Sequence, residues 1–198
     1  MVVFGITGGS GSGKTSVSKM LEKLGVHIID TDVIAHEIVE PNSDCLNELV
    51  DYFGDSILND DKTLNRKKLA SIAFSDKQKT EALSNITHKY IKAEVVKDIN
   101  TTDAELVGID GAVIIGSNVE PLCECIVSVI ADKQSRITRI KTRDNITDEQ
   151  AIQRINAQND DEFYKENSMY IIYNNGDIAQ LESDVVGLFN KIKGNSFE

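Results

Sequence analysis

The sequence contains little proline and cysteine and has a deficit of positive charge. Only 2 of its 198 residues are proline and 40% are apolar, so the chain can bury a sizeable core. No apolar run approaches the roughly 18 residues of a membrane span. No basic segment precedes an apolar one at the N-terminus, so we expect no signal peptide. These absences predict a cytoplasmic protein with no membrane partner.

The deficit of positive charge bears on possible partners. The chain has 21 Lys and Arg residues against 32 Asp and Glu residues, a formal net charge of −11. Binding to a nucleic-acid backbone depends on a broad basic surface, so we expect no nucleic-acid partner. The basic islands of such an acidic chain are therefore informative. They are Arg66-Lys67-Lys68 and the set Arg136, Arg139 and Arg143.

The three cysteines, Cys45, Cys123 and Cys125, do not form a metal-type set. Cys123 and Cys125 are spaced like a pair of metal ligands, but no second cluster completes a site. An odd number of cysteines suits reduced core thiols in a cytosolic protein. The sequence thus favours buried thiols over a metal centre.

The segment 4–15, FGITGGSGSGKT, contains a phosphate-binding motif. Gly8, Gly13, Lys14 and Thr15 fit the pattern G-x-x-x-x-G-K-[ST], with an apolar run before the loop and a helical pattern after it. The glycines allow consecutive backbone N–H groups to approach phosphate oxygens at a helix N-terminus. The alternative is a plain Gly/Ser turn between a strand and a helix. The complete match to the pattern favours phosphate binding.

The chemistry of this loop assigns roles to its residues. Lys14 reaches the β- and γ-phosphates of a nucleoside triphosphate as a point charge, and the Thr15 hydroxyl binds the Mg²⁺ that bridges them. We expect the phosphates to be bound by Gly9, Ser10, Gly11, Ser12, Gly13, Lys14 and Thr15.

Hydrophobic periodicity predicts an α/β chain. Strands are expected over 2–6, 26–29, 105–110, 126–131 and 169–173. Between the second and third strands the helical patterns 43–53, 66–74 and 78–99 occur without a convincing strand, which indicates a helical insertion. Other helices are expected over 15–24, 33–39, 133–142, after Thr147 with a capping box, and over 178–192.

An acidic pair, Asp30 and Asp32, follows the second strand. Ligands of a parallel sheet bind beyond the carboxyl ends of its strands, so we expect the pair beside the phosphate loop. A phosphoryl-transfer enzyme often uses a carboxylate to take the proton of the attacking hydroxyl. If both residues are extended, they point to opposite sides and only one faces the nucleotide. The alternative role is to cap the helix that begins near Val33.

The basic residues and one histidine also have two interpretations each. Arg136, Arg139 and Arg143 recur at i, i+3 and i+7 on one helix face, which suits a clamp on a charged transition state or a solvated basic face. Arg66 suits an anionic substrate, or a surface helix with acidic neighbours. His88 on its expected helix is a packed or capping histidine, or a substrate contact.

An ordered set of motifs resembles dephospho-CoA kinases and covers nearly the whole chain. It comprises Gly5–Lys14, Ile29-Asp-Thr-Asp32, Ala35-His36, Val39-Glu40-Pro41, Tyr52-Phe53-Gly54, Leu64-Asn-Arg66 and Ile86-Thr-His88. It continues with Arg139, Arg143-Asp144, Arg154-Ile-Asn-Ala-Gln158 and Ile172-Tyr-Asn174-Asn175-Gly176. The phosphate loop alone is generic, whereas the order and spacing of the whole set are specific.

The resemblance implies an activity and a fold. The activity is transfer of the ATP γ-phosphate to the 3′-hydroxyl of dephospho-CoA, the last step of coenzyme A synthesis, with ATP and Mg²⁺ as cofactors. The fold is an α/β, P-loop NTPase-type parallel sheet flanked by helices, with a helical substrate-binding insertion and a helical lid. We expect 1–198 to form a single kinase unit, with a core of about 1–41, 104–132 and 168–198, a CoA-binding insertion of about 42–103 and a lid of about 133–167.

The resemblance also implies residue roles. Asp32 corresponds to the catalytic carboxylate and contacts the substrate, which Arg66 and His88 also bind. Catalytic Arg139 and nucleotide-binding Arg143 lie in the lid. Asn175 and Gly176 lie where such kinases hold the adenine.

Because Arg139 and Arg143 carry the family match, we expect Arg136 to be an ordinary solvated residue.

The chain departs from the family pattern after the third strand. The family has a Pro-Leu-Leu-Phe-Glu-like segment where this chain has Ala112-Val-Ile-Ile-Gly116, and Lys89 stands where the family usually shows proline. If the missing carboxylate positions substrate, activity is lower or the acceptor differs. Glu120 is the nearby acidic residue.

Other functions stay open. A phosphate-loop kinase of another small acceptor, such as a nucleoside, has the same nucleotide half, and a catalytically weakened relative binds ATP or CoA without turnover. A switch GTPase is disfavoured because no Asn-Lys-x-Asp guanine-reading motif occurs.

Overall fold

The computed structural model describes residues 1–194, which divide into two compact units. The first consists of Met1–Asp30 and the described residues from Thr101 onwards, and the second is Thr31–Asn100. The expected core segment 168–198 thus extends four residues beyond the described part of the chain.

The first unit is built on a five-stranded sheet whose order is β2-β3-β1-β4-β5. All neighbouring strands are parallel, as the sequence analysis predicted. The strands are β1 (Val2–Thr7), β2 (His27–Asp30), β3 (Leu106–Asp110), β4 (Cys125–Ile130) and β5 (Tyr170–Tyr173). The carboxyl end of the central strand β1 leads directly into the phosphate loop.

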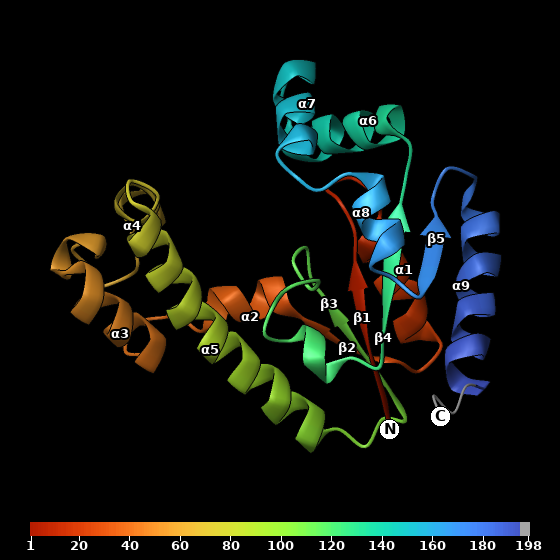
Figure 1. The fold of residues 1–198 in the computed structure, drawn as a ribbon, viewed down its shortest axis with the longest axis horizontal. Helices are drawn as coiled ribbons and strands as arrows, with labels where there is room; N and C mark the ends of the chain where they lie inside the picture. The colour runs from red at the N-terminus through yellow and green to blue at the C-terminus, as the bar shows by residue number, and fades with distance from the viewer. Residues whose placement is uncertain (195–198) are drawn as a thin grey trace. The chain divides into compact units, whose positions relative to one another are not determined.

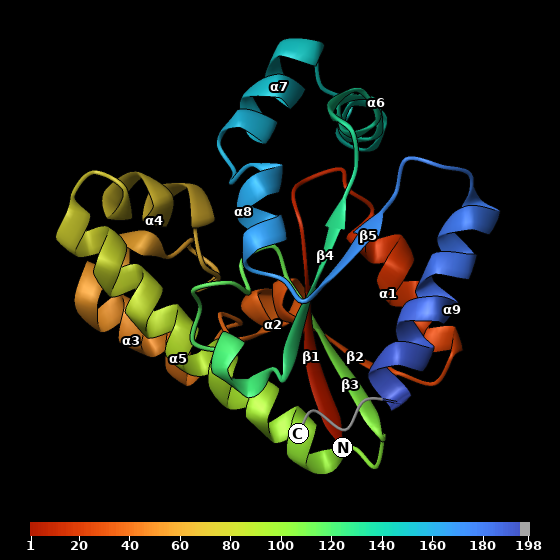
Figure 2. The same cartoon turned by 45° about the vertical axis from the view of Figure 1, so that its right-hand side comes forward.

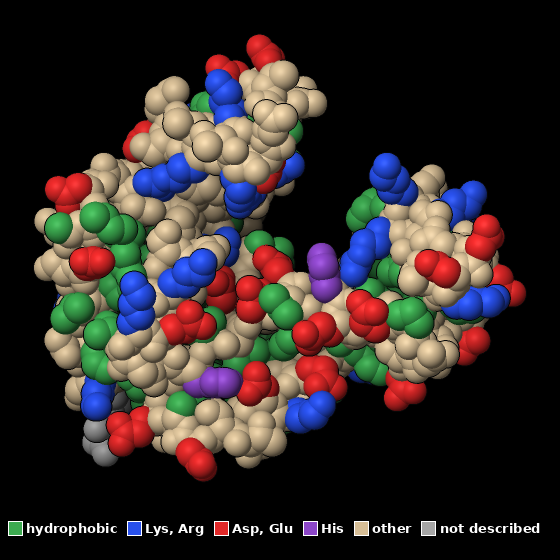
Figure 3. Space-filling view, turned by 180° about the vertical axis from the view of Figure 1, so that it is seen from behind, with side chains coloured by type: hydrophobic (Ala, Val, Ile, Leu, Met, Phe, Trp, Pro, Cys, Tyr) green, Lys and Arg blue, Asp and Glu red, His purple; other side chains and the backbone are tan. Residues whose placement is uncertain are grey.

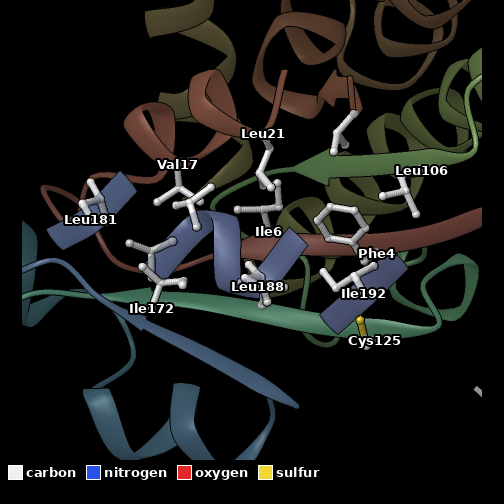
Figure 4. Close-up of a cluster of buried hydrophobic side chains, with 14 residues drawn as sticks. Phe4, Ile6, Val17, Leu21, Leu106, Cys125, Ile172, Leu181, Leu188 and Ile192 are labelled. Atoms are coloured by element: carbon white, nitrogen blue, oxygen red, sulfur yellow. The ribbon is translucent and has the colours of Figure 1, made fainter. Parts of the chain in front are cut away.

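Apolar residues on both faces of the central strands explain why the sheet is covered by helices. Helices α1 (Lys14–Lys23) and α9 (Ile178–Gly194) pack side by side on one face (Figure 1). Figure 4 shows side chains from β1, α1 and α9 meeting in this core. Phe4, Ile6, Val17 and Leu21 are each 0% exposed. Each such buried side chain contributes about 1.5–3 kcal/mol of transfer free energy, so this core holds β1 and α1 on either side of the loop.

Three helices, α6 (Lys133–Asp144), α7 (Asp148–Asn156) and α8 (Asp161–Glu166), connect β4 to β5 (Figure 2). Thr147 and Gln150 form the predicted capping box at the start of α7. A small apolar cluster that includes Ile140 and Ile155 joins α6 to α7. Helix α8 was not predicted from the sequence, because it has only 6 residues and little room for a periodic pattern.

The second unit is helical, as predicted. It contains α2 (Thr31–Glu37), α3 (Asp44–Phe53), the 3₁₀ turn η1 (Asp55–Ile57), α4 (Arg66–Ala73) and most of α5 (Lys77–Thr101). Ser43 and Asn65 cap α3 and α4 through their side-chain oxygens. Within this unit the only bridge of β type is the isolated pair Leu58 and Leu64.

The surface has a mixed charge pattern. On the face seen in Figure 3, Lys and Arg side chains are interspersed with Asp and Glu side chains. Within residues 1–194, no helix combines the length and apolar character needed to cross a membrane.

Candidate active site

The phosphate loop runs from Gly8 to Gly13 between β1 and α1. Gly13 is the N-cap residue of α1 and has a left-handed backbone conformation, φ 101° and ψ 22°. The first backbone N–H groups of an α-helix have no carbonyl partner within the helix, so the loop presents donors and the positive end of the helix dipole to an anion. The Lys14 ammonium is 3.1 Å from the carbonyl oxygen of Gly8 and is therefore folded over the loop.

Neighbouring segments closely approach several glycines of the loop, including Gly9 and Gly13. A Cβ on Gly13 would lie 2.0 Å from Nδ2 of Asn174, and one on Gly9 would lie 2.3 Å from Nη2 of Arg136. The neighbouring segments therefore pack directly against the loop backbone, which explains glycine at these positions without reference to the nucleotide.

Arg139 and Asn174 hold the loop from one side. Arg139 Nη1 donates to the carbonyl oxygens of Gly11 and Ser12, each at 3.2 Å, and Nη2 donates to the Asn174 carbonyl at 3.0 Å. Asn174 Nδ2 donates to the Ser12 carbonyl at 2.8 Å. The guanidinium predicted to act in the lid thus lies at the loop, where its charge is available to a phosphate.

Arg136 is not the solvated residue that the sequence analysis expected. It is 5% exposed, and its Nε donates to the Ser10 carbonyl at 2.9 Å. The expectation was wrong because helical spacing shows which residues share a face but not what that face packs against.

Arg143, the third arginine of this face, lies farther along α6. It forms a bidentate ion pair with Asp144, with Nε to Oδ1 at 2.7 Å and Nη2 to Oδ2 at 2.9 Å. The hydrogen bonds from Arg143, together with the charge of Arg154, lower the pKa of Asp144 to about 2. Within residues 1–194 Arg143 forms no hydrogen bond or ion pair with the loop, so the structure brings Arg139 to the loop but not Arg143.

The turn after β5 lies at the start of α6. The Asn175 side chain accepts a hydrogen bond from the backbone N–H of Asp132, the N-cap residue of α6, at 2.7 Å. Gly176 lies in the predicted turn, where only Gln180 would approach an added Cβ, at 3.4 Å. The turn thus positions α6 through Asn175, while its Gly176 backbone is accessible.

The acidic pair does not alternate along an extended segment. Asp30 is the last residue of β2 and pairs in register with Asp110, whereas Asp32 lies in the first turn of α2. Helix α2 begins at Thr31, two residues before the expected start near Val33, so Asp32 is helical and not extended. An acidic residue in a first turn also stabilises the helix dipole, so Asp32 has a structural role beside any catalytic one.

Asp110 is a candidate site residue that the sequence reasoning missed. It is the last residue of β3, is 9% exposed, and accepts a hydrogen bond from Ser18 Oγ of α1 at 2.7 Å. Ser18 lies one helical turn after Thr15, on the helix that begins at the loop. The sequence did contain a signal for it, because Asp110 is an acidic residue at the carboxyl end of the predicted strand 105–110, where ligands of a parallel sheet bind.

In the second unit, Arg66 and His88 line the same cavity, of about 350 Å³. Arg66 is the first residue of α4, and His88 lies on α5. The remaining walls are mainly apolar and include Leu64, Leu69 and Ile91. The structure thus brings together two residues that the sequence places on different helices.

Glu120 lies at the segment that departs from the family pattern. Its Oε2 accepts a hydrogen bond from the backbone N–H of Gly116 at 2.6 Å. A carboxylate is therefore present beside position 116, although it is supplied by a residue four positions later.

Cys45 and Cys125 are buried, as expected, whereas Cys123 is partly exposed. Burial raises the pKa of Cys123 to about 12 and those of Cys45 and Cys125 to about 11. Within the described residues, no group of three or more His, Cys, Asp or Glu side chains could hold a metal ion.

Comparison with known proteins identifies the family. The protein-family model described as dephospho-CoA kinase matches residues 2–180 of this chain. A dephospho-CoA kinase of Lactobacillus johnsonii is 34% identical over 191 residues, which are 95% of this chain and 96% of that protein. The structure of a dephospho-CoA kinase from Campylobacter jejuni, 26% identical, covers 98% of each chain with a TM-score of 0.69.

A crystal structure from Thermus thermophilus shares the fold with a TM-score of 0.83, at 24% identity over 96% of this chain and 97% of that one. These matches confirm both the resemblance drawn from the ordered motifs and the α/β fold class. The chain belongs to the dephospho-CoA kinase family.

Proposed function

We propose that this member of the dephospho-CoA kinase family binds ATP at the loop 8–15 and transfers its γ-phosphate to the 3′-hydroxyl of dephospho-CoA. The observation that carries the proposal is the phosphate loop with Arg139 beside it. The Arg139 guanidinium is 3.2 Å from two carbonyl oxygens of the loop. Phosphoryl transfer relies on positioning and on charge stabilisation, and these groups supply both.

Mg²⁺ fits the donors at the loop. The described residues offer no protein cage for a metal ion, and Mg²⁺ in kinases is held by one or two protein oxygens together with substrate phosphates. Thr15 would supply a hydroxyl and Asp110 a carboxylate at the carboxyl end of β3. When bound, Mg²⁺ would neutralise charge on the β- and γ-phosphate oxygens.

Lys14 and Arg139 stabilise the negative charge of the transferring phosphoryl group in this mechanism. Lys14 acts as a point charge, while the planar Arg139 guanidinium offers several donors in fixed directions. The nucleotide base would lie by the turn that contains Asn175 and Gly176. Arg143 would bind the nucleotide when the lid region 133–167 moves.

Asp32 is proposed as the general base. Its carboxylate would accept the proton of the 3′-hydroxyl as the hydroxyl oxygen bonds to the γ-phosphorus and the bond to the β-γ bridging oxygen breaks, releasing ADP. The support is its position in the chain, two residues after the end of β2, together with the family match.

Arg66 and His88 are proposed to bind dephospho-CoA. The substrate carries a diphosphate and a long, mainly neutral arm. A cavity with apolar walls, one arginine and one histidine suits that combination.

The test is an assay of the purified protein with ATP, Mg²⁺ and dephospho-CoA, beside a panel of nucleosides. We expect release of ADP that depends on dephospho-CoA and a product phosphorylated at the 3′-hydroxyl. ADP release that ignores dephospho-CoA but responds to a nucleoside would show a kinase for another acceptor. ATP binding without turnover on any acceptor would show a weakened relative.

The Asp32→Asn variant tests the base, with Asp30→Asn as the matched control. We expect kcat of Asp32→Asn to fall at least ~10²-fold while ATP still binds, as on loss of a positioned general base. The same change at Asp30 should have a much smaller effect. Near-normal turnover of Asp32→Asn would remove Asp32 from this role.

A further inference from the structure

The backbone of Ser10, in the middle of the phosphate loop, is held at both its N–H and its carbonyl group by side chains from one distant region. The backbone N–H of Ser10 donates to Gln158 Oε1 at 2.7 Å, and its carbonyl oxygen accepts from Arg136 Nε at 2.9 Å. Arg136 Nη2 donates to the same Gln158 oxygen at 3.4 Å. The three residues therefore form a closed ring of hydrogen bonds, which we call the Ser10 brace.

The burial of Arg136 shows that this ring is a built feature. The Arg136 side chain is only 6% exposed, and its Nη1 lies 3.6 Å from the carboxylate of Asp161. A charged group buried to this extent is costly unless it is paired and hydrogen-bonded. The brace hydrogen-bonds Nε and Nη2, and the carboxylate of Asp161 balances the charge, so these contacts favour one orientation of Arg136.

The loop is shaped to receive α6. A Cβ on Gly9 would lie 2.3 Å from Arg136 Nη2, and one on Gly11 would lie 2.8 Å from the Arg136 carbonyl oxygen. Close packing of this kind permits few alternative loop conformations while the brace is intact.

The brace gathers three segments of the region between β4 and β5. Arg136 lies on α6, Gln158 between α7 and α8, and Asp161 at the start of α8. We infer that Arg136 and Gln158 are positioning residues that set the affinity for ATP by holding the phosphate loop in its binding conformation. This inference rests on the proposed binding of ATP at loop 8–15.

The kinetic consequence differs for the two substrates. If only a fraction of molecules has the binding-competent loop, the apparent dissociation constant of ATP rises by the inverse of that fraction. We expect Arg136→Gln and Gln158→Leu each to raise the KM for ATP by about tenfold, as for a competent fraction of about one tenth. Because bound ATP restores the loop, kcat should fall less than about threefold and the KM for dephospho-CoA should stay unchanged.

A conservative variant separates the hydrogen bonds from general packing. Gln158→Glu keeps an oxygen that accepts from Ser10 and from Arg136, so its KM for ATP should stay within about threefold of wild type. In the double variant Arg136→Gln and Gln158→Glu, the glutamate has no arginine to pair with. Its KM for ATP should therefore be raised as in Arg136→Gln alone. The matched control is Lys141→Gln, which removes one positive charge from α6 at an ion pair with Asp148, away from the brace; it should leave the KM for ATP unchanged.

Hydrogen exchange provides a readout independent of turnover. The Ser10 amide should exchange faster in Gln158→Leu than in wild type, while amides of β1 and β4 keep their protection. Binding of ATP measured by calorimetry should weaken in parallel with KM. These measurements remain informative if the protein fails to phosphorylate dephospho-CoA, so loss of the proposed function and loss of the inference are distinguishable.

Three results would overturn the inference. One is unchanged ATP affinity in both Arg136→Gln and Gln158→Leu. Another is an equal rise in KM for both substrates, which indicates general disruption. The third is unchanged exchange at Ser10 in Gln158→Leu.

Discussion

Arg139 and Asn174 converge on one backbone carbonyl, that of Ser12. Arg139 Nη1 lies 3.2 Å and Asn174 Nδ2 2.8 Å from this oxygen, and the Asn174 carbonyl in turn accepts from Arg139 Nη2 at 3.0 Å. The residue that follows β5 and a residue of α6 therefore act on the loop as a unit.

Removal of the Asn174 side chain should destabilise the protein. Asn174 is 7% exposed, so in Asn174→Ala the Ser12 carbonyl loses a buried donor but keeps Arg139, at a cost of about 0.5–1.5 kcal/mol in the free energy of unfolding. Urea denaturation measures this cost. Asn167→Ala, which removes an exposed hydrogen bond to Phe163, is the control and should change stability by less than about 0.5 kcal/mol.

The same pair should be energetically coupled. In a double-mutant cycle of Asn174→Ala and Arg139→Ala, we expect an interaction energy of about 0.5–3 kcal/mol. Strictly additive effects would contradict the shared role at Ser12.

Substitution of Gly13 should abolish nucleotide binding for a steric reason. In Gly13→Ala the added Cβ meets Asn174 Nδ2 at 2.0 Å, and the residue also keeps a positive φ of 101°. We expect ATP affinity to fall at least ~10²-fold as the loop is displaced. Gly25→Ala is the matched control, because Gly25 has φ 93° but, among the described residues, no atom lies within 4 Å of an added Cβ. It should cost a little stability and leave ATP affinity unchanged.

Loss of Arg139 should affect the transition state more than the bound nucleotide. We expect Arg139→Ala to lower kcat by about 10²-fold, the usual loss for a positioned donor to developing charge. Binding of ATP measured by calorimetry should weaken less. Arg154→Ala, which removes the same charge from an exposed ion pair with Asp144, is the control. An equal loss of kcat and of ATP affinity would assign Arg139 to loop structure alone.

Asp110 should control the requirement for Mg²⁺. Asp110→Asn replaces a buried carboxylate at the end of β3 by a neutral amide of similar size. We expect the Mg²⁺ concentration for half-maximal activity to rise by about 10–100-fold, the range seen when groups that support a metal site are changed. Ser18→Ala, which removes the hydrogen bond to Asp110, should cause a smaller rise. An unchanged Mg²⁺ dependence in Asp110→Asn would exclude Asp110 from the metal site.

The partly buried thiol of Cys123 should give a characteristic pH dependence. Burial raises the pKa of Cys123 from 9.0 to about 12, so the folded protein retains a proton that the unfolded chain releases above pH 9. The stability due to this thiol is present below pH 9 and is lost as the pH rises towards 12. Unfolding measured from pH 8 to 11 should show a weaker decline in Cys123→Ala than in wild type. The native protein should also resist alkylation at pH 8.

Patterns over a few residues predicted much of this protein. The phosphate loop, the capping box at Thr147 and the parallel strands follow from turn chemistry and apolar periodicity, which act locally. The sequence also indicated Arg139 and the turn at Asn175, because these belong to ordered motifs. Its expectation for Arg136 was wrong because local spacing contains no information about the surface that a helix face meets.

The sequence by itself determined the loop, the order of the strands and of all the longer helices along the chain, and the family. Only the tertiary structure decided which side chains hold the loop. Arg136 is 126 positions and Asn174 162 positions from the loop residues that they contact. Parallel strands joined by long connections bring such residues together at the carboxyl edge of the sheet, and no signal in either local segment specifies its distant partner.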